Sequence, residues 1–112
     1  MKVSKETESK IVELQTMEQN LQNFAMQKQR FQVSLTETEN AIEELNKTKE
    51  DSYRIIGSIM VKTNKDELLK DLKEKKDIID LRIKNIEKQE VKIREKAQEL
   101  QKEVMQKIEN EK

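Results

Sequence analysis

Two stretches of this chain place apolar side chains at the a and d positions of a seven-residue repeat, and this pattern constrains the fold more than any other feature. The first repeat has Leu14, Leu21, Lys28, Leu35 and Ile42 at a, and Met17, Phe24, Phe31, Thr38 and Leu45 at d. The second has Leu69, Lys76, Ile83, Glu90, Ala97 and Val104 at a, and Leu72, Ile79, Ile86, Ile93 and Leu100 at d. A period of about 3.5 residues over several heptads is the signature of a coiled coil. We therefore predict a mainly α protein with two long helices, at about residues 8–50 and 64–109, in one domain of residues 1–112.

The composition is also typical of a disordered chain, because charged residues make up 41% of the sequence and aromatic residues only 3%. The chain has no Pro and one Gly, however, and is rich in good helix formers. Acid–base pairs at helical spacing support the second helix: Asp66 with Lys70, Asp71 with Lys75, Asp80 with Lys84, Glu90 with Arg94 and Glu103 with Lys107. In a disordered chain the apolar repeat and the spacing of the charge pairs would have no reason to agree. We therefore predict helices that bury a narrow seam.

The segment between the two repeats is rich in β-branched residues and has a different period. Gly57-Ser58 lies between two short apolar stretches and suits a two-residue turn, because Gly adopts positive φ without steric cost. We predict a β-hairpin at 53–62, with strands at 53–56 and 59–62, and an N-cap for the next helix at Thr63 or Asn64. Two arms of similar length around such a segment favour an antiparallel helical hairpin over one continuous rod.

Both faces of this β-hairpin carry an apolar pair. Ile56 opposes Ile59 on one face, and Ile55 opposes Met60 on the other. A lone two-stranded hairpin is marginal in water, and its open edges invite further pairing. We predict that it completes a sheet or barrel with copies of itself or with relatives. The alternative is that it caps the end of the coiled coil.

The sequence argues against catalysis and against cofactor binding. There is no His and no Cys, so the usual general base, thiol nucleophile and soft metal ligands are absent, and the single Gly excludes a phosphate-binding loop. We predict no enzymatic activity and no cofactor. The formal net charge is zero and no apolar run reaches membrane-spanning length, which argues against nucleic acid and membranes as partners. We expect a cytoplasmic protein, because the first ten residues lack a signal-like apolar segment.

Four polar residues interrupt the predicted seam. In an antiparallel arrangement Lys28 falls near Glu90, and Thr38 falls near Lys76. These residues can form pairs that set the register of the helices. For the lysines, the sequence favours the alternative that their long side chains extend to water.

A second group of apolar residues lies near the two ends of the chain: Ile11, Val12, Leu14, Met17, Val104, Met105 and Ile108. An antiparallel hairpin brings these residues together at one end. Val12, Met105 and Ile108 lie off the seam positions, and Met is suited to binding varied partners because it is flexible and polarizable. The alternative is ordinary seam closure with a few exposed apolar residues. The sequence leaves both interpretations open.

The connecting segment resembles that of a known family. It runs Tyr53-Arg54-Ile55-Ile56-Gly57-Ser58-Ile59-Met60-Val61-Lys62, and matches the aromatic, basic, apolar pair, Gly, polar, three apolar, Lys pattern of β-type prefoldin subunits. The stretch from Asn20 to Gln29 is similar to the Gln-rich first arm of that family. The resemblance covers nearly the whole chain, and the short single linker is closer to an archaeal β subunit than to a eukaryotic one.

The resemblance implies an ATP-independent chaperone. Prefoldins are hexamers of two α-type and four β-type subunits, whose hairpins form β-barrels and whose coiled-coil tips hold unfolded proteins for a group II chaperonin. It implies an assembly role for Tyr53, Ile55, Ile56, Ile59, Met60 and Val61. It makes the seven apolar residues near the chain ends candidates for client binding. The alternatives are a structural coiled-coil adaptor or filament protein, and a helical nucleic-acid binder on the basic second arm.

Overall fold

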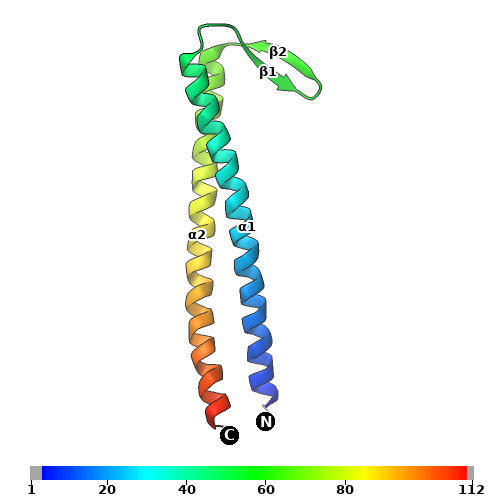
Figure 1. Cartoon of the computed structure of the whole chain (residues 1–112), viewed down its shortest axis with the longest axis vertical. Coiled ribbons are helices and arrows are strands. Elements are labelled where there is room, and N and C mark those ends of the chain that lie inside the picture. Colours follow the sequence, from blue (N-terminus) through cyan, green and yellow to red (C-terminus); the bar gives the residue numbers. More distant parts are fainter. Residues whose placement is uncertain (1–3, 111–112) are drawn as a thin grey trace. The chain divides into compact units, whose positions relative to one another are not determined.

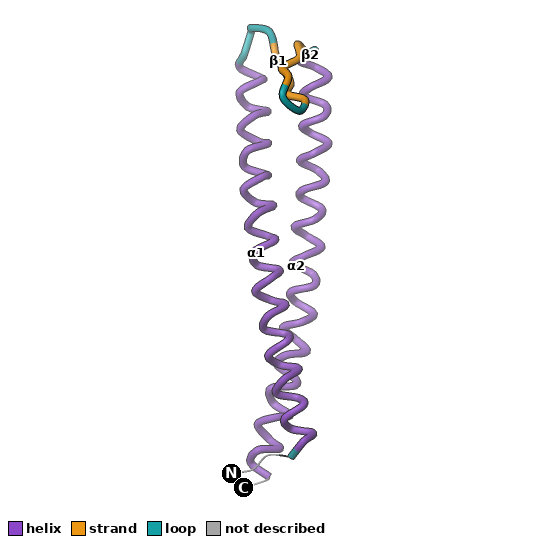
Figure 2. Tube along the Cα trace, turned by 90° about the vertical axis from the view of Figure 1, so that its right-hand side faces the viewer, coloured by secondary structure: helices purple, strands orange, loops and turns teal. Residues whose placement is uncertain are grey.

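The computed structural model describes residues 4–110, which form two helices joined by a β-hairpin. The elements are α1 (Lys5–Lys47), β1 (Ser52–Ile56), β2 (Ile59–Thr63) and α2 (Lys65–Asn110), traced in chain order in Figure 1 and Figure 2. The predicted fold, two long helices with an antiparallel two-stranded hairpin between them, is confirmed. Helix α1 begins and ends about three residues earlier than predicted.

Helix α1 begins early because Ser4 caps it. The Ser4 hydroxyl accepts a hydrogen bond from the Thr7 amide at 3.2 Å, and the Ser4 carbonyl accepts the first helical hydrogen bond, from the Glu8 amide. A Ser side chain in this position satisfies an amide that the helix itself cannot pair. The apolar repeat does not mark this start, because it begins only at Leu14.

A contact from the other helix marks the end of α1. The Lys65 ammonium, in the first turn of α2, donates a hydrogen bond to the Thr48 carbonyl at 2.9 Å. A cation near the C-terminal carbonyls of a helix offsets the partial negative charge there. Nothing in the local sequence predicts this end, because Lys49 and Glu50 are acceptable helix residues.

The β-hairpin has the register predicted from the sequence, with Ile56 opposite Ile59, Ile55 opposite Met60 and Tyr53 opposite Lys62. Gly57 has a φ of 60°, and no other described residue has a positive φ. A positive φ at the first central position alone is the mark of a type II′ turn, which matches the twist of antiparallel strands.

Helix α2 begins at an asparagine cap. The Asn64 side-chain oxygen accepts hydrogen bonds from the amides of Asp66 at 2.8 Å and Glu67 at 3.4 Å. Of the two predicted caps, the structure therefore uses Asn64.

The chain divides into two compact units, each built from parts of both helices. The first comprises Met1–Lys28 and Lys84–Lys112, of which residues 4–28 and 84–110 are described, and the second comprises Gln29–Ile83. Within the first unit the helical segments run antiparallel, because Glu6 pairs with Lys107 and Lys10 with Glu103. Within the second, Thr48 meets Lys65 and the Arg82 guanidinium lies 5.7 Å from the centre of the Phe31 ring.

The predicted seam contains most of the buried residues among those described, with Thr7 and Ser52 as the exceptions. Every predicted a and d position is buried or half-buried. The apolar residues that are most buried all lie on α2: Ile79, Ile83, Ile86, Leu100 and Val104. A seam of this kind buries little area per residue, which explains how a chain with few aromatic residues forms it.

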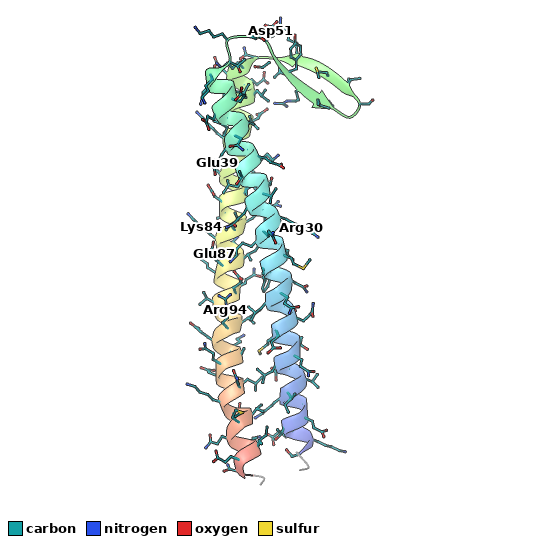
Figure 3. All side chains as sticks on the ribbon, viewed as in Figure 1. Arg30, Glu39, Asp51, Lys84, Glu87 and Arg94 are labelled. Atoms are coloured by element: carbon teal, nitrogen blue, oxygen red, sulfur yellow. The ribbon has the colours of Figure 1, made fainter. Side chains whose placement is uncertain are left out.

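The structure corrects the interpretation of the polar seam residues. The Lys28 ammonium lies 2.9 Å from the Glu90 carboxylate, whose residue is only 3% exposed, so the prediction that Lys28 extends to water is wrong. The Arg94 guanidinium, labelled in Figure 3, lies 3.6 Å from the other Glu90 oxygen. Thr38 forms no pair with Lys76; its hydroxyl donates to the Ser34 carbonyl of its own helix at 2.7 Å.

The surface pairs predicted along α2 are mostly absent. Of the five, only Glu90 with Arg94 lies within 4 Å among the described residues. Asp71, Glu103 and Lys107 instead pair with residues outside α2, namely Arg54, Lys10 and Glu6. For these three residues, ion pairs with residues outside α2 take the place of the predicted pairs within the helix.

Candidate functional site: the β-hairpin and the helix ends

The β-hairpin carries a dense group of exposed apolar side chains. Its six predicted assembly residues are all exposed in this chain: Tyr53, Ile55, Ile56, Ile59, Met60 and Val61. Contiguous apolar surface of this kind is rare on a monomer and usually marks an interface. The sheet contains two strands among the described residues, so each strand also has an unpaired edge.

The two faces of the hairpin differ in how much the helices cover them. The face of Ser52, Arg54 and Thr63 is buried or half-buried at its base. The opposite face is bare, with Ile55 71% exposed and Met60 67% exposed. The bare face is therefore the stronger candidate for contact with another chain.

Polar contacts hold the base of the hairpin. The Arg54 guanidinium forms an ion pair with the Asp71 carboxylate in α2, and Lys62 forms one with Asp51 at 3.3 Å. The Ser52 hydroxyl is buried and has no hydrogen-bond partner among the described residues. These contacts fix the base of the hairpin and leave its apolar residues uncovered.

The predicted client-binding residues fall into three groups by exposure. Val12 and Met105 are exposed, while Ile11, Leu14, Met17 and Ile108 are half-buried. Val104 is buried, because it occupies an a position of the seam. All seven lie in the first unit, and two of them, Val12 and Met105, present most of their surface to solvent.

An ion-pair network joins the two chain ends within this unit. Glu6 pairs with Lys107 and lies 3.6 Å from Lys10, which also pairs with Glu103. The Lys107 hydrogen bond and charge, helped by Lys10, lower the pKa of Glu6, and the hydrogen bond to Glu103 raises the pKa of Lys10. Both charged forms are thus favoured in the folded chain.

Several exposed apolar residues on the helices were not singled out from the sequence. They are Met26, Val33, Ile78, Leu81 and Val91. Met26 and Val33 occupy the same heptad position as Val12. This spacing of seven or fourteen residues is the sequence feature from which their exposure could have been predicted. Such scattered residues are common on protein surfaces and do not by themselves define a site.

Among residues 4–110 there is no group of three or more acidic residues that could hold a metal ion. No helix in that range is long and apolar enough to cross a membrane.

The fold defines a class of helical-hairpin proteins with a β-hairpin between the two helices. The family model described as prefoldin subunit matches residues 8–111. The chain is 38% identical to prefoldin subunit beta of Archaeoglobus fulgidus over 93 residues, covering 81% of this chain and 80% of the relative. It is 39% identical to prefoldin subunit beta of Pyrococcus furiosus over 90 residues, covering 79% and 77%.

A solved structure gives the same result. The crystal structure of the prefoldin beta subunit from Thermococcus strain KS-1 matches with a TM-score of 0.86 and 31% identity, over 94% of each chain. This chain therefore belongs to the prefoldin family, and the resemblance to β-type subunits is confirmed.

Proposed function

We propose that this protein is a subunit of an ATP-independent chaperone that holds unfolded polypeptides, limits their aggregation and passes them to a group II chaperonin in the cytoplasm. The observation that carries the proposal is the bare apolar face of the β-hairpin, in a member of the prefoldin family. Covering Ile55 and Met60 requires another chain, since no described segment of this one lies over them.

The proposed partner is an α-type prefoldin subunit, in a hexamer of two α-type and four β-type chains. Tyr53, Ile55, Ile56, Ile59, Met60 and Val61 supply the contacts, and the open strand edges extend the sheet into a neighbouring subunit. Fully burying each large apolar side chain stabilises the assembly by about 1.5–3 kcal/mol. The β-hairpin, which is marginal alone, becomes stable in the assembly.

Client binding is assigned to the helix ends, with Val12 and Met105 as the principal contacts and Ile108 beside them. Ile11, Leu14, Met17 and Val104 are half-buried or buried, so they contribute where the helix ends open locally around a client. Each patch is small and binds weakly. Several subunits joined in one assembly raise the effective concentration of patches, so avidity replaces a deep pocket.

The test measures assembly and client holding on the same variants. The native mass of the full chain, alone and mixed with a candidate α-type subunit, is determined by light scattering. Suppression of aggregation of a denatured client enzyme is then followed by turbidity. We expect a discrete hetero-oligomer on mixing, and suppression by that oligomer.

Two pairs of variants separate the two surfaces. Ile55→Asp with Met60→Asp is expected to abolish assembly, whereas Val33→Asp, at an exposed α1 position, is expected to leave it intact. Val12→Gln with Met105→Gln is expected to assemble normally and weaken suppression severalfold. Its matched control is Met26→Gln with Val33→Gln, because those residues are 56% and 54% exposed against 59% and 63% for the helix-end pair.

Each outcome has a clear meaning. A hetero-oligomer that survives the hairpin substitutions contradicts the assembly surface. Equal suppression by the helix-end variant and its control contradicts client binding at Val12 and Met105. A stable dimer of this chain that ignores the α-type subunit and suppresses nothing favours a structural coiled-coil adaptor instead.

A further inference from the structure

Four lysines follow one another at every fourth position along α2. They are Lys84, Lys88, Lys92 and Lys96, and we call them the lysine stripe. All four are exposed, and among the described residues no carboxylate lies within 4 Å of any of their ammonium groups. Figure 3 labels Lys84 and Glu87 at the start of this stretch of α2.

The spacing of the stripe works against the helix that carries it. Like charges four residues apart on a helix repel each other and destabilise it by about as much as opposite charges stabilise it. The stripe contains three such pairs in succession. Glu90, on the same helix, is by contrast paired with Arg94 and with Lys28 of α1. A partner that neutralises the stripe would remove this repulsion.

Three lysines of the stripe line an apolar depression on α2. A shallow hollow of about 510 Å³ is lined by Lys84, Glu87, Lys88, Val91 and Lys92. Val91 is half-exposed in its wall, and the methylene stems of the lysines supply further apolar surface. The site therefore offers a small apolar contact beside three cations and one carboxylate, Glu87.

We propose that this surface of α2 binds an acidic amphipathic helix of a partner protein. An apolar side chain of that helix enters the hollow at Val91, and carboxylates one turn to either side pair with the lysine stripe. The proposal rests on charge complementarity, and it concerns residues separate from the β-hairpin and the helix ends.

A folded polypeptide suits the surface better than nucleic acid. Glu87 and Glu95 lie among the lysines and repel a continuous line of phosphates, whereas a peptide can place neutral residues opposite them. The apolar hollow also has no counterpart in a phosphate backbone. Nucleic-acid binding depends on dense positive charge, which this stretch lacks.

The test uses a fluorescein-labelled synthetic helical peptide in which glutamates flank leucines at helical spacing. Its counterpart carries glutamine in place of every glutamate, and a single-stranded oligonucleotide serves as a second polyanion. Binding to the full chain is measured by fluorescence anisotropy at low and high salt. We expect the glutamate peptide to bind, the glutamine peptide to bind much more weakly, and salt to weaken the former.

The stripe variant is Lys84→Gln, Lys88→Gln, Lys92→Gln and Lys96→Gln in one chain. We expect it to bind the acidic peptide about tenfold more weakly, since exposed charge pairs each contribute little. The matched control changes four exposed lysines without ion pairs among the described residues to Gln: Lys5, Lys49, Lys70 and Lys73. We expect that control to bind like the unmodified chain, and Val91→Ser to bind severalfold more weakly.

Circular dichroism is used to check that the variants remain helical, which the comparisons require. We expect a slightly higher Tm for the stripe variant, because the repulsion between its ammonium groups has been removed. Equal weakening in the control variant overturns the proposal, since binding then depends on total charge alone. Oligonucleotide binding as tight as peptide binding, and lost with the same lysines, also overturns it. Unchanged binding by Val91→Ser overturns the amphipathic nature of the partner.

Discussion

A buried ion pair is the most informative feature at the scale of single residues. Glu90 is almost fully buried and pairs with Lys28 across the seam, with Arg94 as a more distant second cation. Removing two charges from water costs free energy that their attraction only partly returns. Such a pair contributes little net stability but penalises any register in which either charge lacks its partner.

We predict that Lys28→Met destabilises the chain by about 1–3 kcal/mol, because it leaves the buried Glu90 carboxylate with Arg94 alone. The double variant Lys28→Met with Glu90→Leu is expected to recover most of that loss. Free energies of unfolding in urea at fixed protein concentration measure both effects.

Lys76→Met is the control for this cycle. Lys76 occupies an a position like Lys28, but no carboxylate lies within 4 Å of its ammonium group among the described residues. Its replacement by Met is expected to be neutral or stabilising. Equal effects of Lys28→Met and Lys76→Met would show that the Glu90 pair is energetically unimportant.

The sequence predicted which residues enter the seam but not how the polar ones are satisfied. Heptad position fixes the direction of a side chain from its helix. It does not fix whether a lysine reaches a carboxylate across the seam or turns to water, since that depends on how closely the helices approach. Thr38 is tolerated for a local reason, its hydrogen bond to the Ser34 carbonyl, which no pattern distinguishes from a cross-seam contact.

At the scale of elements, the β-hairpin depends on the backbone of one residue. Gly57 has a φ of 60°, and a Cβ at this position would meet no atom within 4 Å. Any penalty for a side chain at Gly57 therefore comes from the backbone conformation alone.

We predict that Gly57→Ala destabilises the hairpin by about 1 kcal/mol. Amide hydrogen exchange at Ile56 and Ile59, the cross-strand pair next to the turn, is then expected to accelerate by about fivefold, with α1 and α2 unchanged. Ser58→Ala is the control, because Ser58 does not have a positive φ. Similar exchange in the two variants would contradict a specific need for glycine at this turn.

The register of the hairpin was predictable, whereas the ends of the helices were less so. Alternating apolar residues around Gly57-Ser58 leave one register that pairs Ile56 with Ile59. The start of α1 at Lys5 depends on a Ser4 cap that precedes the apolar repeat. Its end depends on Lys65, which is distant in sequence, so local propensity carries no signal for it.

At the scale of the whole molecule, an ion-pair network joins the two arms near the chain ends. Residues 1–52 have more acidic than basic side chains, and residues 53–112 have the reverse. The network does not follow this imbalance, because each arm contributes one acid and one base: Glu6 and Lys10 from α1, and Glu103 and Lys107 from α2. The lowered pKa of Glu6 and the raised pKa of Lys10 both reflect it.

The network predicts a dependence of stability on pH. The pKa of Glu6 is lower in the folded chain, so its contribution is fully present above the ordinary pKa of about 4.3 and is lost as pH falls through the folded value. The pKa of Lys10 is higher in the folded chain, so its contribution is fully present below about 10.4 and is lost as pH rises through the folded value.

We expect Glu6→Gln to lower Tm slightly near pH 7, and this difference to vanish in acid, where Glu6 is protonated in either state. High salt is expected to reduce the difference at pH 7, because the groups are exposed. Thermal unfolding of both chains across pH measures the effect. Glu18→Gln, at an exposed position without an ion pair among the described residues, is the control. Equal changes in the two variants would contradict a role for the network.

The candidate surfaces were predicted unevenly. Four of the six hairpin residues form the apolar pairs on the two faces, and the resemblance to the prefoldin family added Tyr53 and Val61; all six are exposed. The predicted client-binding set at the helix ends contains residues off the seam together with seam residues. Val104 belongs to the seam as well as to this set, and it is buried. The lysine stripe is present in the sequence, but a pattern of opposite charges at helical spacing does not reveal it, because its charges are all alike.

The hydrogen bond from Lys65 to the Thr48 carbonyl has a consequence for how such chains diversify. It joins the end of α1 to the start of α2. Residues 49–64 therefore form a connecting segment whose two flanking residues are in contact. We expect a different segment between Thr48 and Lys65 to keep these two helix ends in contact, because the two residues that form the contact are unchanged. Exchanging residues 49–64 would then replace the exposed apolar surface of the β-hairpin while keeping the two helices.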